Sequence, residues 1–421
     1  MPSLADRLKA LGVQVGAQNL APRQEEYPYP IEKVVGGETL YNHFGKTYQV
    51  EERYPAGHLH GSLGLLTTSP LDALAAWNSD DRLRSLDPHA IAFIDTETTG
   101  LSGGTGTYAF MIGIGRFIGD EFQTLQLFMR DPAEEPAQLA ALEEVLAPAQ
   151  ALVTFNGKTF DLPLLRTRFT THGLKPSWSD LAHIDLLHIS RRLWRDRLPS
   201  RTLGNLENQI LGARRTEDDV PGWMIPSLYF DYLRSGDARP LRGVFYHNKI
   251  DVISMAALLN CISSLLADPS GAALPDQSDL LSIAKFYEAV GDADAAAVLY
   301  HECLQRELSE TQQVEAMLKL AQIRKRAGDF PAAITLWKQA AFHWSLEAHI
   351  ELAKAYEHRL REPLAALEWT QAAIQLVNHS DAAAFEKRSQ LADLEYRQTR
   401  LERKLSGTAS GGDDIISPPD E

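Results

Sequence analysis

Two carboxylates end an apolar segment near residue 95. Asp95 and Glu97 follow the apolar run at residues 92–94 and stand two positions apart in AFIDTETTG. In a β-strand, residues i and i+2 point to the same face, so these side chains would project side by side. Two buried like charges are costly unless a positive group neutralises them, and a hard divalent cation prefers carboxylate oxygens. The pair therefore indicates a candidate Mg²⁺ or Mn²⁺ site, although D-x-E taken alone more often marks a helix N-cap with a solvated acid.

Two further acids occupy positions that suit the same chemistry. Asp161, in TFNGKTFDLPLL, comes just after an apolar strand and at the start of a helix. Asp251, in YHNKIDVISMAALL, begins the apolar face of a long helix, with His247 four residues earlier. Residues i and i+4 share one face of a helix, so His247 and Asp251 can face one cleft. A neutral imidazole suits the deprotonation of water near neutral pH. Taken alone, each acid also fits an ordinary helix start.

The elements that would position these residues form an α/β domain over residues 89–268. Three apolar segments at short spacing, the last two joined by a tight turn, predict strands: AIAFIDTET, YAFMIGIGRF and EFQTLQLFMR. Another buried strand is predicted at ALVTFNG. Helical periodicity marks PAQLAALEEVLAPA, DLPLLRTRFTTHG and the long GVFYHNKIDVISMAALLNCISSLLA. This order predicts a mixed sheet flanked by helices.

The flanking regions differ in character. Residues 1–88 are rich in Pro and Gly, and we expect an N-terminal extension that packs on the α/β domain. Residues 276–405 contain a helical repeat in which Ala296, Ala333 and Ala366 recur, and this resembles tetratricopeptide helix pairs. The sequence from 406 to 421 predicts a disordered acidic tail.

Composition places the chain among soluble proteins of a reducing compartment. The 421 residues contain 44% hydrophobic residues and two cysteines, which do not suggest a disulfide scaffold. We find neither a signal peptide nor a run of about 18 apolar residues, so we expect a cytoplasmic protein with no membrane partner. The net charge of −15 argues against nonspecific coating of nucleic acid. Residues 156–201 depart from this, with nine Lys or Arg against four Asp or Glu.

The order of the motifs resembles a known superfamily. D-x-E, then N-x-x-x-F-D, then H-x-x-x-D is similar to the DEDD superfamily of 3′–5′ exonucleases, which have a ribonuclease H-like fold. Within it, the chain resembles the YprB-like ribonuclease H domain family. The segments that carry this resemblance are TFNGKTFDLPLLRTRF, RTLGNLENQILGARRTEDDVPGWMIPSLYFDYLRSGD and the C-terminal repeats.

The resemblance implies a ligand set for two Mg²⁺ or Mn²⁺ ions and a general base. The implied ligands are Asp95, Glu97, Asp161 and Asp251, and the implied base is His247. Two cations about 3.5–4 Å apart can neutralise the scissile phosphate, activate a water and stabilise the leaving oxygen.

The last motif departs from the superfamily in its spacing. The histidine class places His five residues before the last Asp and the tyrosine class places Tyr four before, whereas here Tyr246 stands at five and His247 at four. We expect His247 to be the base, because four residues bring it over Asp251 on a helix. A tyrosine hydroxyl, with an ordinary pKa of about 10, is mostly protonated at pH 7 but can orient a water.

Several residues are candidates for substrate binding. The resemblance implies contacts with the terminal nucleotide just after the first motif, at Thr98 and Leu101. Basic and polar residues near the other motifs could contact phosphates: Asn156, Lys158, Arg191 and Arg195. The arginines also fit a solvated helix end. Trp194, Trp223 and Tyr229 could stack on bases, although core packing is the more usual role of such residues.

These observations lead to one expected function and two alternatives. We expect a metal-dependent 3′–5′ exonuclease that acts on DNA, with a single-stranded DNA end as substrate and RNA as the alternative. The resemblance points to DNA repair, with the repeats binding a protein partner for which a helicase is a candidate. The alternatives are an RNA-processing exonuclease and a non-catalytic nucleic-acid-binding scaffold.

Overall fold

The computed structural model describes residues 29–55, 57–100, 105–271 and 276–409. The chain divides into two compact units, Met1–Ala272 and Ala273–Glu421. Leu101 and the acidic segment 410–421 lie outside the described residues.

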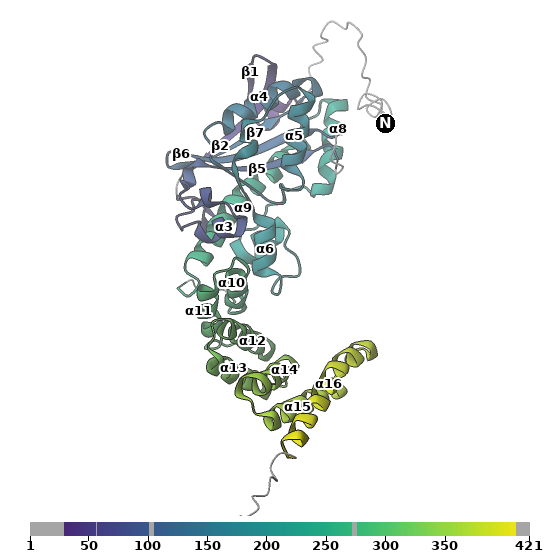
Figure 1. The fold of residues 1–421 in the computed structure, drawn as a ribbon. Coiled ribbons are helices and arrows are strands. Elements are labelled where there is room, and N and C mark those ends of the chain that lie inside the picture. Colours follow the sequence, from purple (N-terminus) through teal and green to yellow (C-terminus); the bar gives the residue numbers. More distant parts are fainter. Residues whose placement is uncertain (1–28, 56, 101–104, 272–275, 410–421) are drawn as a thin grey trace, which may run out of the picture. The chain divides into compact units, whose positions relative to one another are not determined.

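The first unit is built on a mixed seven-stranded sheet with helices on its faces, which confirms the predicted fold class (Figure 1). The strand order is β1-β2-β7-β6-β5-β8-β9. The bounds of the strands are β1 Glu38–Asn42, β2 Gly45–Tyr54, β5 Ile91–Thr98, β6 Ala109–Ile118, β7 Glu121–Phe128, β8 Ala151–Thr154 and β9 Ala182–Asp185. The pairs β5–β8 and β8–β9 are parallel and the remaining pairs are antiparallel.

The N-terminal region contributes strands to this sheet rather than only packing on it. β2 pairs along its length with β7, from Tyr48 opposite Phe128 to Tyr54 opposite Phe122, and β1 forms the edge. The prediction of residues 1–88 as an extension misses these strands because β2 (GKTYQVEERY) is largely polar, with Glu51, Glu52 and Arg53 exposed. A short hairpin, β3 (Leu59–His60) and β4 (Leu63–Gly64), follows.

Helices cover both faces of the sheet. On one face, α4 (Glu135–Leu146) and α5 (Asp161–Thr171) bury leucines against β5, β6 and β8. On the other, α8 (Ile225–Ser235) and α9 (Leu241–Ala267) pack on aromatic residues of β6 and β7. Among the described residues, α9 is the one helix long and apolar enough to cross a membrane, but most of its apolar window is buried inside the unit, as in a core helix.

Two glycines of β6 allow α9 to approach the sheet closely. A Cβ at Gly113 would lie 2.3 Å from Asn248 Oδ1, and one at Gly115 would lie 2.6 Å from Val252 Cγ1. Replacement of Gly113 would therefore displace the segment of α9 that carries His247 and Asn248.

We predict that Gly113→Ala lowers the free energy of unfolding by about 1–3 kcal/mol, the usual cost of overpacking a core. The measurement is urea denaturation beside Gly204→Ala, where the added Cβ meets nothing within 4 Å. Equal stability of the two variants would show that α9 moves away from β6 without cost.

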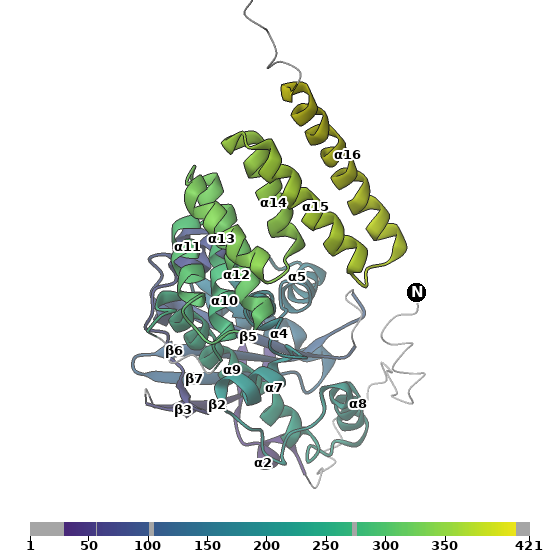
Figure 2. The same cartoon turned by 90° about the horizontal axis from the view of Figure 1, so that it is seen from below.

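The second unit is entirely helical in its described residues. Its helices are α10 (Ser278–Ala289), α11 (Ala293–Cys303), α12 (Glu310–Arg326), α13 (Phe330–Phe342), α14 (Leu346–Ala355), α15 (Pro363–His379) and α16 (Ala384–Ala409). Figure 2 shows α15 and α16 side by side. Because α16 continues to Ala409, residues 406–409 belong to a helix and not to the predicted disordered tail.

The repeated residues occupy equivalent places in these helices. Ala296, Ala333 and Ala366 are fully buried, where a larger side chain would separate the packed helices. Gly291 and Gly328 have positive φ values before Asp292 and Asp329, which cap α11 and α13. In the third copy a non-glycine residue, Arg361, takes the left-handed conformation.

Candidate active site

The first two acids lie on β5, near the centre of the sheet. Asp95 and Glu97 are half-buried, and the register of β5 with β6 shifts after Glu97. Asp95 Oδ2 accepts a hydrogen bond of 2.8 Å from Asn248 Nδ2, and Asn248 Oδ1 accepts one of 2.9 Å from Gln126 Nε2. Asn248 of α9 therefore links Asp95 of β5 to Gln126 of β7.

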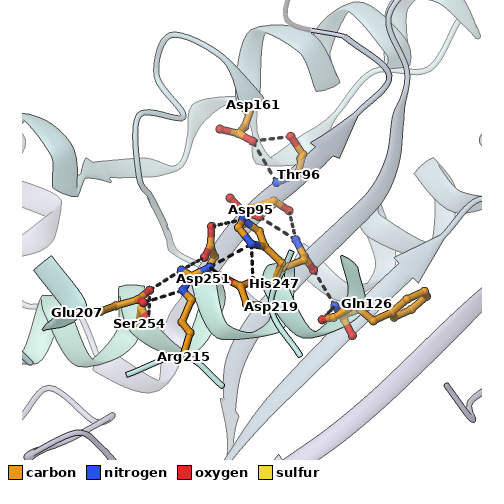
Figure 3. Close-up of polar contacts among 12 residues, drawn as sticks. Asp95, Thr96, Gln126, Asp161, Glu207, Arg215, Asp219, His247, Asp251 and Ser254 are labelled. Atoms are coloured by element: carbon orange, nitrogen blue, oxygen red, sulfur yellow. Dashed lines mark hydrogen bonds and ion pairs between the residues drawn. The ribbon is translucent and has the colours of Figure 1, made fainter. Parts of the chain in front are cut away.

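Asp161 begins α5 and is linked directly to β5. Its Oδ1 accepts hydrogen bonds from the Thr96 amide at 3.1 Å and from the Thr96 hydroxyl at 2.5 Å (Figure 3). The loop before α5 is braced by Asp185, whose carboxylate accepts from the backbone N–H groups of Asn156 and Lys158. Asp185 thus stabilises the loop that leads into Asp161.

His247 and Asp251 lie one turn apart on α9, as the i, i+4 spacing predicts. His247 Nε2 is 3.8 Å from Asp251 Oδ2. Tyr246 points elsewhere: its hydroxyl accepts from the Thr216 amide at 2.9 Å, and its ring lines a separate cavity beside Lys249 and Glu52. The geometry therefore places His247, and not Tyr246, beside the last acid.

Burial and mutual repulsion make this acid cluster electrostatically strained. Burial and the charges of Asp251 and Glu97 raise the pKa of Asp95 well above its ordinary value. Burial and the charges of Asp251 and Asp161 do the same for Glu97. Burial also raises the pKa of Asp161 to about 6 and raises that of Asp251. Clusters of this kind are typical of functional sites.

Three residues of this site were not predicted from the sequence. Arg215 donates to Asp251 and makes two hydrogen bonds to Glu207, of 2.7 Å from Nε and 2.6 Å from Nη2. Asp219 Oδ1 lies 2.7 Å from His247 Nδ1. The segment NQILGARRTEDD shows no periodicity that would single out these residues, because Arg215 and Asp219 follow an irregular connection after a π-helical turn at Glu207–Leu211.

A cavity of about 610 Å³ opens over the acids. Asp95, Glu97 and Asp161 line it together with two of the predicted substrate-binding residues, Thr98 and Asn156. The lining also includes residues that were not predicted to belong to the site, among them Thr107, Thr159, Phe160, Thr167, Gly222 and Pro226.

The basic candidates lie apart from this lining. Lys158 Nζ donates a hydrogen bond of 3.1 Å to Asn78 Oδ1. The contact of Lys158 that stabilises the loop before α5 is made by its backbone N–H, which donates to Asp185. Arg191, on α6 (Leu186–Trp194), and Arg195, which follows it, are exposed. Of the three aromatic candidates, Trp194 and Tyr229 are buried core residues, whereas Trp223 is 81% exposed and adjoins Gly222 of the cavity.

The four carboxylates are suitable ligands for a hard divalent cation, but they do not surround a single point in this structure. Among the residues that the structure describes, no three His, Cys, Asp or Glu side chains form a ready-made metal site. Asp95, Asp161 and Asp251 instead contact Asn248, Thr96 and Arg215, respectively. All four acids offer the oxygen ligands that Mg²⁺ and Mn²⁺ prefer, and a bound cation would offset the burial and repulsion that raise their pKa values.

The sheet, its flanking helices and the acids on β5 define a ribonuclease H-like fold of the kind found in nucleases, and residues 92–263 match the RNase_H superfamily. The chain is also 32% identical over 368 residues to YprB of Bacillus subtilis (strain 168), which is described as an uncharacterized protein. This match covers 85% of the chain and 86% of that protein. The chain belongs to the YprB family.

Proposed function

We propose that the chain is a two-metal-ion 3′–5′ exonuclease of the DEDD type that hydrolyses phosphodiester bonds of DNA. The observation that supports this most strongly is that acids of β5 and α5 line one cavity and that an acid of α9 acts electrostatically on those of β5. Asp95, Glu97 and Asp161 share one cavity, and the charge of Asp251 acts on both Asp95 and Glu97. His247 stands beside Asp251.

The residues of the site divide the chemistry between them. The four acids would hold the ions, and bound ions would neutralise the scissile phosphate and lower the pKa of the attacking water. In the His247 tautomer whose Nδ1–H donates to Asp219, the lone pair of Nε2 is left to take a proton from that water. Nε2 is also the nitrogen nearer Asp251, which places the base beside a proposed ligand.

The cavity and its aromatic rim suit the end of a single strand. A volume of about 610 Å³ is in the range of ligand-binding cavities. Phe160 lines the cavity and is 51% exposed although it directly precedes Asp161, and the exposed Trp223 adjoins another lining residue, Gly222. Unpaired bases stack on such rings without regard to sequence.

We predict that Phe160→Ala weakens the binding of a single-stranded oligonucleotide by roughly 5- to 150-fold, since one stacked base contributes about 1–3 kcal/mol. Fluorescence anisotropy with Ca²⁺ in place of Mg²⁺ measures this. Tyr41→Ala is the matched control, because Tyr41 is an exposed aromatic residue on β1, outside the cavity. Equal affinity of the two variants would remove Phe160 from the substrate site.

The substrate class is tested by digestion of matched oligonucleotides. Single-stranded DNA, duplex DNA and RNA of one sequence, each labelled at the 5′ end, are incubated with Mg²⁺, Mn²⁺ or chelator. We expect single-stranded DNA to be shortened fastest. Faster shortening of RNA would favour an RNA-processing exonuclease, and no cleavage of any substrate would favour a non-catalytic nucleic-acid-binding scaffold.

We further propose that the helical unit binds a protein partner and that the protein acts in cytoplasmic DNA repair. The support is the resemblance of the helix pairs to tetratricopeptide repeats, whose stacked helices present extended binding surfaces. A groove of about 1020 Å³ runs along α12 and α13, lined by Met317, Leu336 and Phe342 among others. A helicase remains the candidate partner, and copurification with the full chain but not with residues 1–272 would support this assignment.

A further inference from the structure

The guanidinium of Arg215 is held at the edge of the acid cluster by a buried carboxylate. Glu207 is 1% exposed and accepts two hydrogen bonds from Arg215 in a fork geometry. It also accepts a hydrogen bond of 2.8 Å from Ser254 Oγ, which in turn lies 2.8 Å from His60 Nε2. Burial alone would lower the pKa of Arg215, but Glu207 and Asp251 more than offset this and raise it. The guanidinium is therefore a fixed cation.

The N-terminal hairpin supports this arrangement. His60 belongs to β3, and the Ser62 amide donates to Leu211 O at 2.9 Å at the end of the π-helical turn that begins with Glu207. Gly61 has a φ of +66°, and a Cβ there would lie 2.1 Å from the same carbonyl oxygen. The hairpin thus packs directly against the turn that carries Glu207.

Two nitrogens of Arg215 face the catalytic candidates, and one of them, Nη2, also donates to Glu207. Nη2 donates to Asp251 Oδ1, and Nη1 lies 3.5 Å from Asp219 Oδ2 and 3.1 Å from His247 Nδ1. One rigid group therefore contacts a proposed metal ligand, the proposed base and the acid that orients that base (Figure 3). The negative charges of Asp95, Glu97 and Asp251 repel one another, and the contact with Arg215 favours the charged form of Asp251.

We propose that Arg215, fixed by Glu207, is a positioning residue that holds Asp251 and the Asp219–His247 pair in their working orientation. This inference rests on the proposed function. Glu207 and Arg215 carry opposite charges, so the pair adds no net charge to the site, and its effect is on orientation. Supporting residues of this kind typically change metal affinity or activity by about 10- to 100-fold.

The test replaces both members of the pair, because loss of Arg215 alone would leave Glu207 buried without its partner. Glu207→Gln/Arg215→Gln keeps the net charge of the pair at zero. The control is Arg130→Gln/Glu134→Gln, which removes another fork-shaped pair, outside the lining of the acid cavity, with a similarly exposed arginine. Arg215→Lys is a third variant, which keeps the charge but cannot contact Glu207 and Asp251 through one planar fork.

Four quantities are measured: the free energy of unfolding in urea with chelator, the Mn²⁺ dissociation constant by calorimetry without substrate, and kcat and KM on single-stranded DNA. We expect the Gln/Gln variant and Arg215→Lys to bind Mn²⁺ about 10- to 100-fold more weakly and to lose kcat by a similar factor. The control should retain both parental values, and the two double variants should have similar stability.

Two outcomes would overturn the inference. Parental Mn²⁺ affinity and kcat in the Gln/Gln variant would make the pair purely structural. Tighter Mn²⁺ binding would show that Arg215 competes with the ion for Asp251. Failure of the proposed function is distinguishable, because the parent chain itself would then neither bind Mn²⁺ nor cleave DNA.

Discussion

Replacement of Asp95 by asparagine is expected to lower phosphodiester cleavage by roughly 10³-fold or more, the scale of the several kcal/mol that metal ions contribute to such reactions. Chelation of divalent ions should have the same effect on the parent chain, and added Mn²⁺ or Mg²⁺ should restore it. The physical reason is that clustered acids repel a phosphate unless cations lie between them.

Stability provides a second, independent readout of the same substitution. Burial and three neighbouring acids disfavour the charge of Asp95 in the folded chain, so Asp95→Asn should not reduce the free energy of unfolding in chelator. Asp120→Asn, an exposed acid in the turn between β6 and β7, is the control and should keep parental cleavage. Full cleavage by folded Asp95→Asn would exclude Asp95 as a required ligand.

The second large effect is expected at His247, the proposed general base. His247→Ala should lower kcat by roughly 10²-fold or more, as loss of a positioned base does. The Mn²⁺ dissociation constant should change little, because the four acids remain. Measurement of kcat and of Mn²⁺ affinity in the same preparations separates loss of the base from loss of the ions.

Tyr246→Phe is the matched comparison from the adjacent position. It removes the hydroxyl that accepts from the Thr216 amide, so we expect a loss of stability of about 1 kcal/mol and only a small change in kcat. The reverse pattern, with Tyr246→Phe inactive and His247→Ala active, would place the enzyme with the tyrosine class in mechanism.

The predictable part of the site consists of residues on regular elements. Asp95 and Glu97 were found from strand alternation and His247 with Asp251 from helix spacing, because these periodicities fix the direction of a side chain from local sequence alone. The mixed sheet flanked by helices followed from the order of apolar segments.

The remaining parts depend on contacts between distant segments. Arg215 meets Glu207 and Asp251 through a π-helical turn and an irregular connection, which no short-range pattern specifies. The exposed residues Glu51, Glu52 and Arg53 make β2 polar, so it is recognisable as a strand only through its pairing with β7. The charge of Arg191 and Arg195 predicts phosphate contacts, but neither residue lines the acid cavity. The position of a basic helix relative to a cavity depends on tertiary packing, which a local charge pattern does not specify.

The most direct test of the central claim follows a 5′-labelled single-stranded DNA oligonucleotide over time with the full chain and Mn²⁺. We expect a ladder that shortens from the 3′ end, and we expect its absence in chelator and with Asp95→Asn. A matched oligonucleotide with phosphorothioate linkages at its 3′ end should resist shortening. Three results would contradict a metal-dependent 3′–5′ exonuclease. These are cleavage in saturating chelator, cleavage at internal positions, and immediate release of a short labelled 5′ fragment.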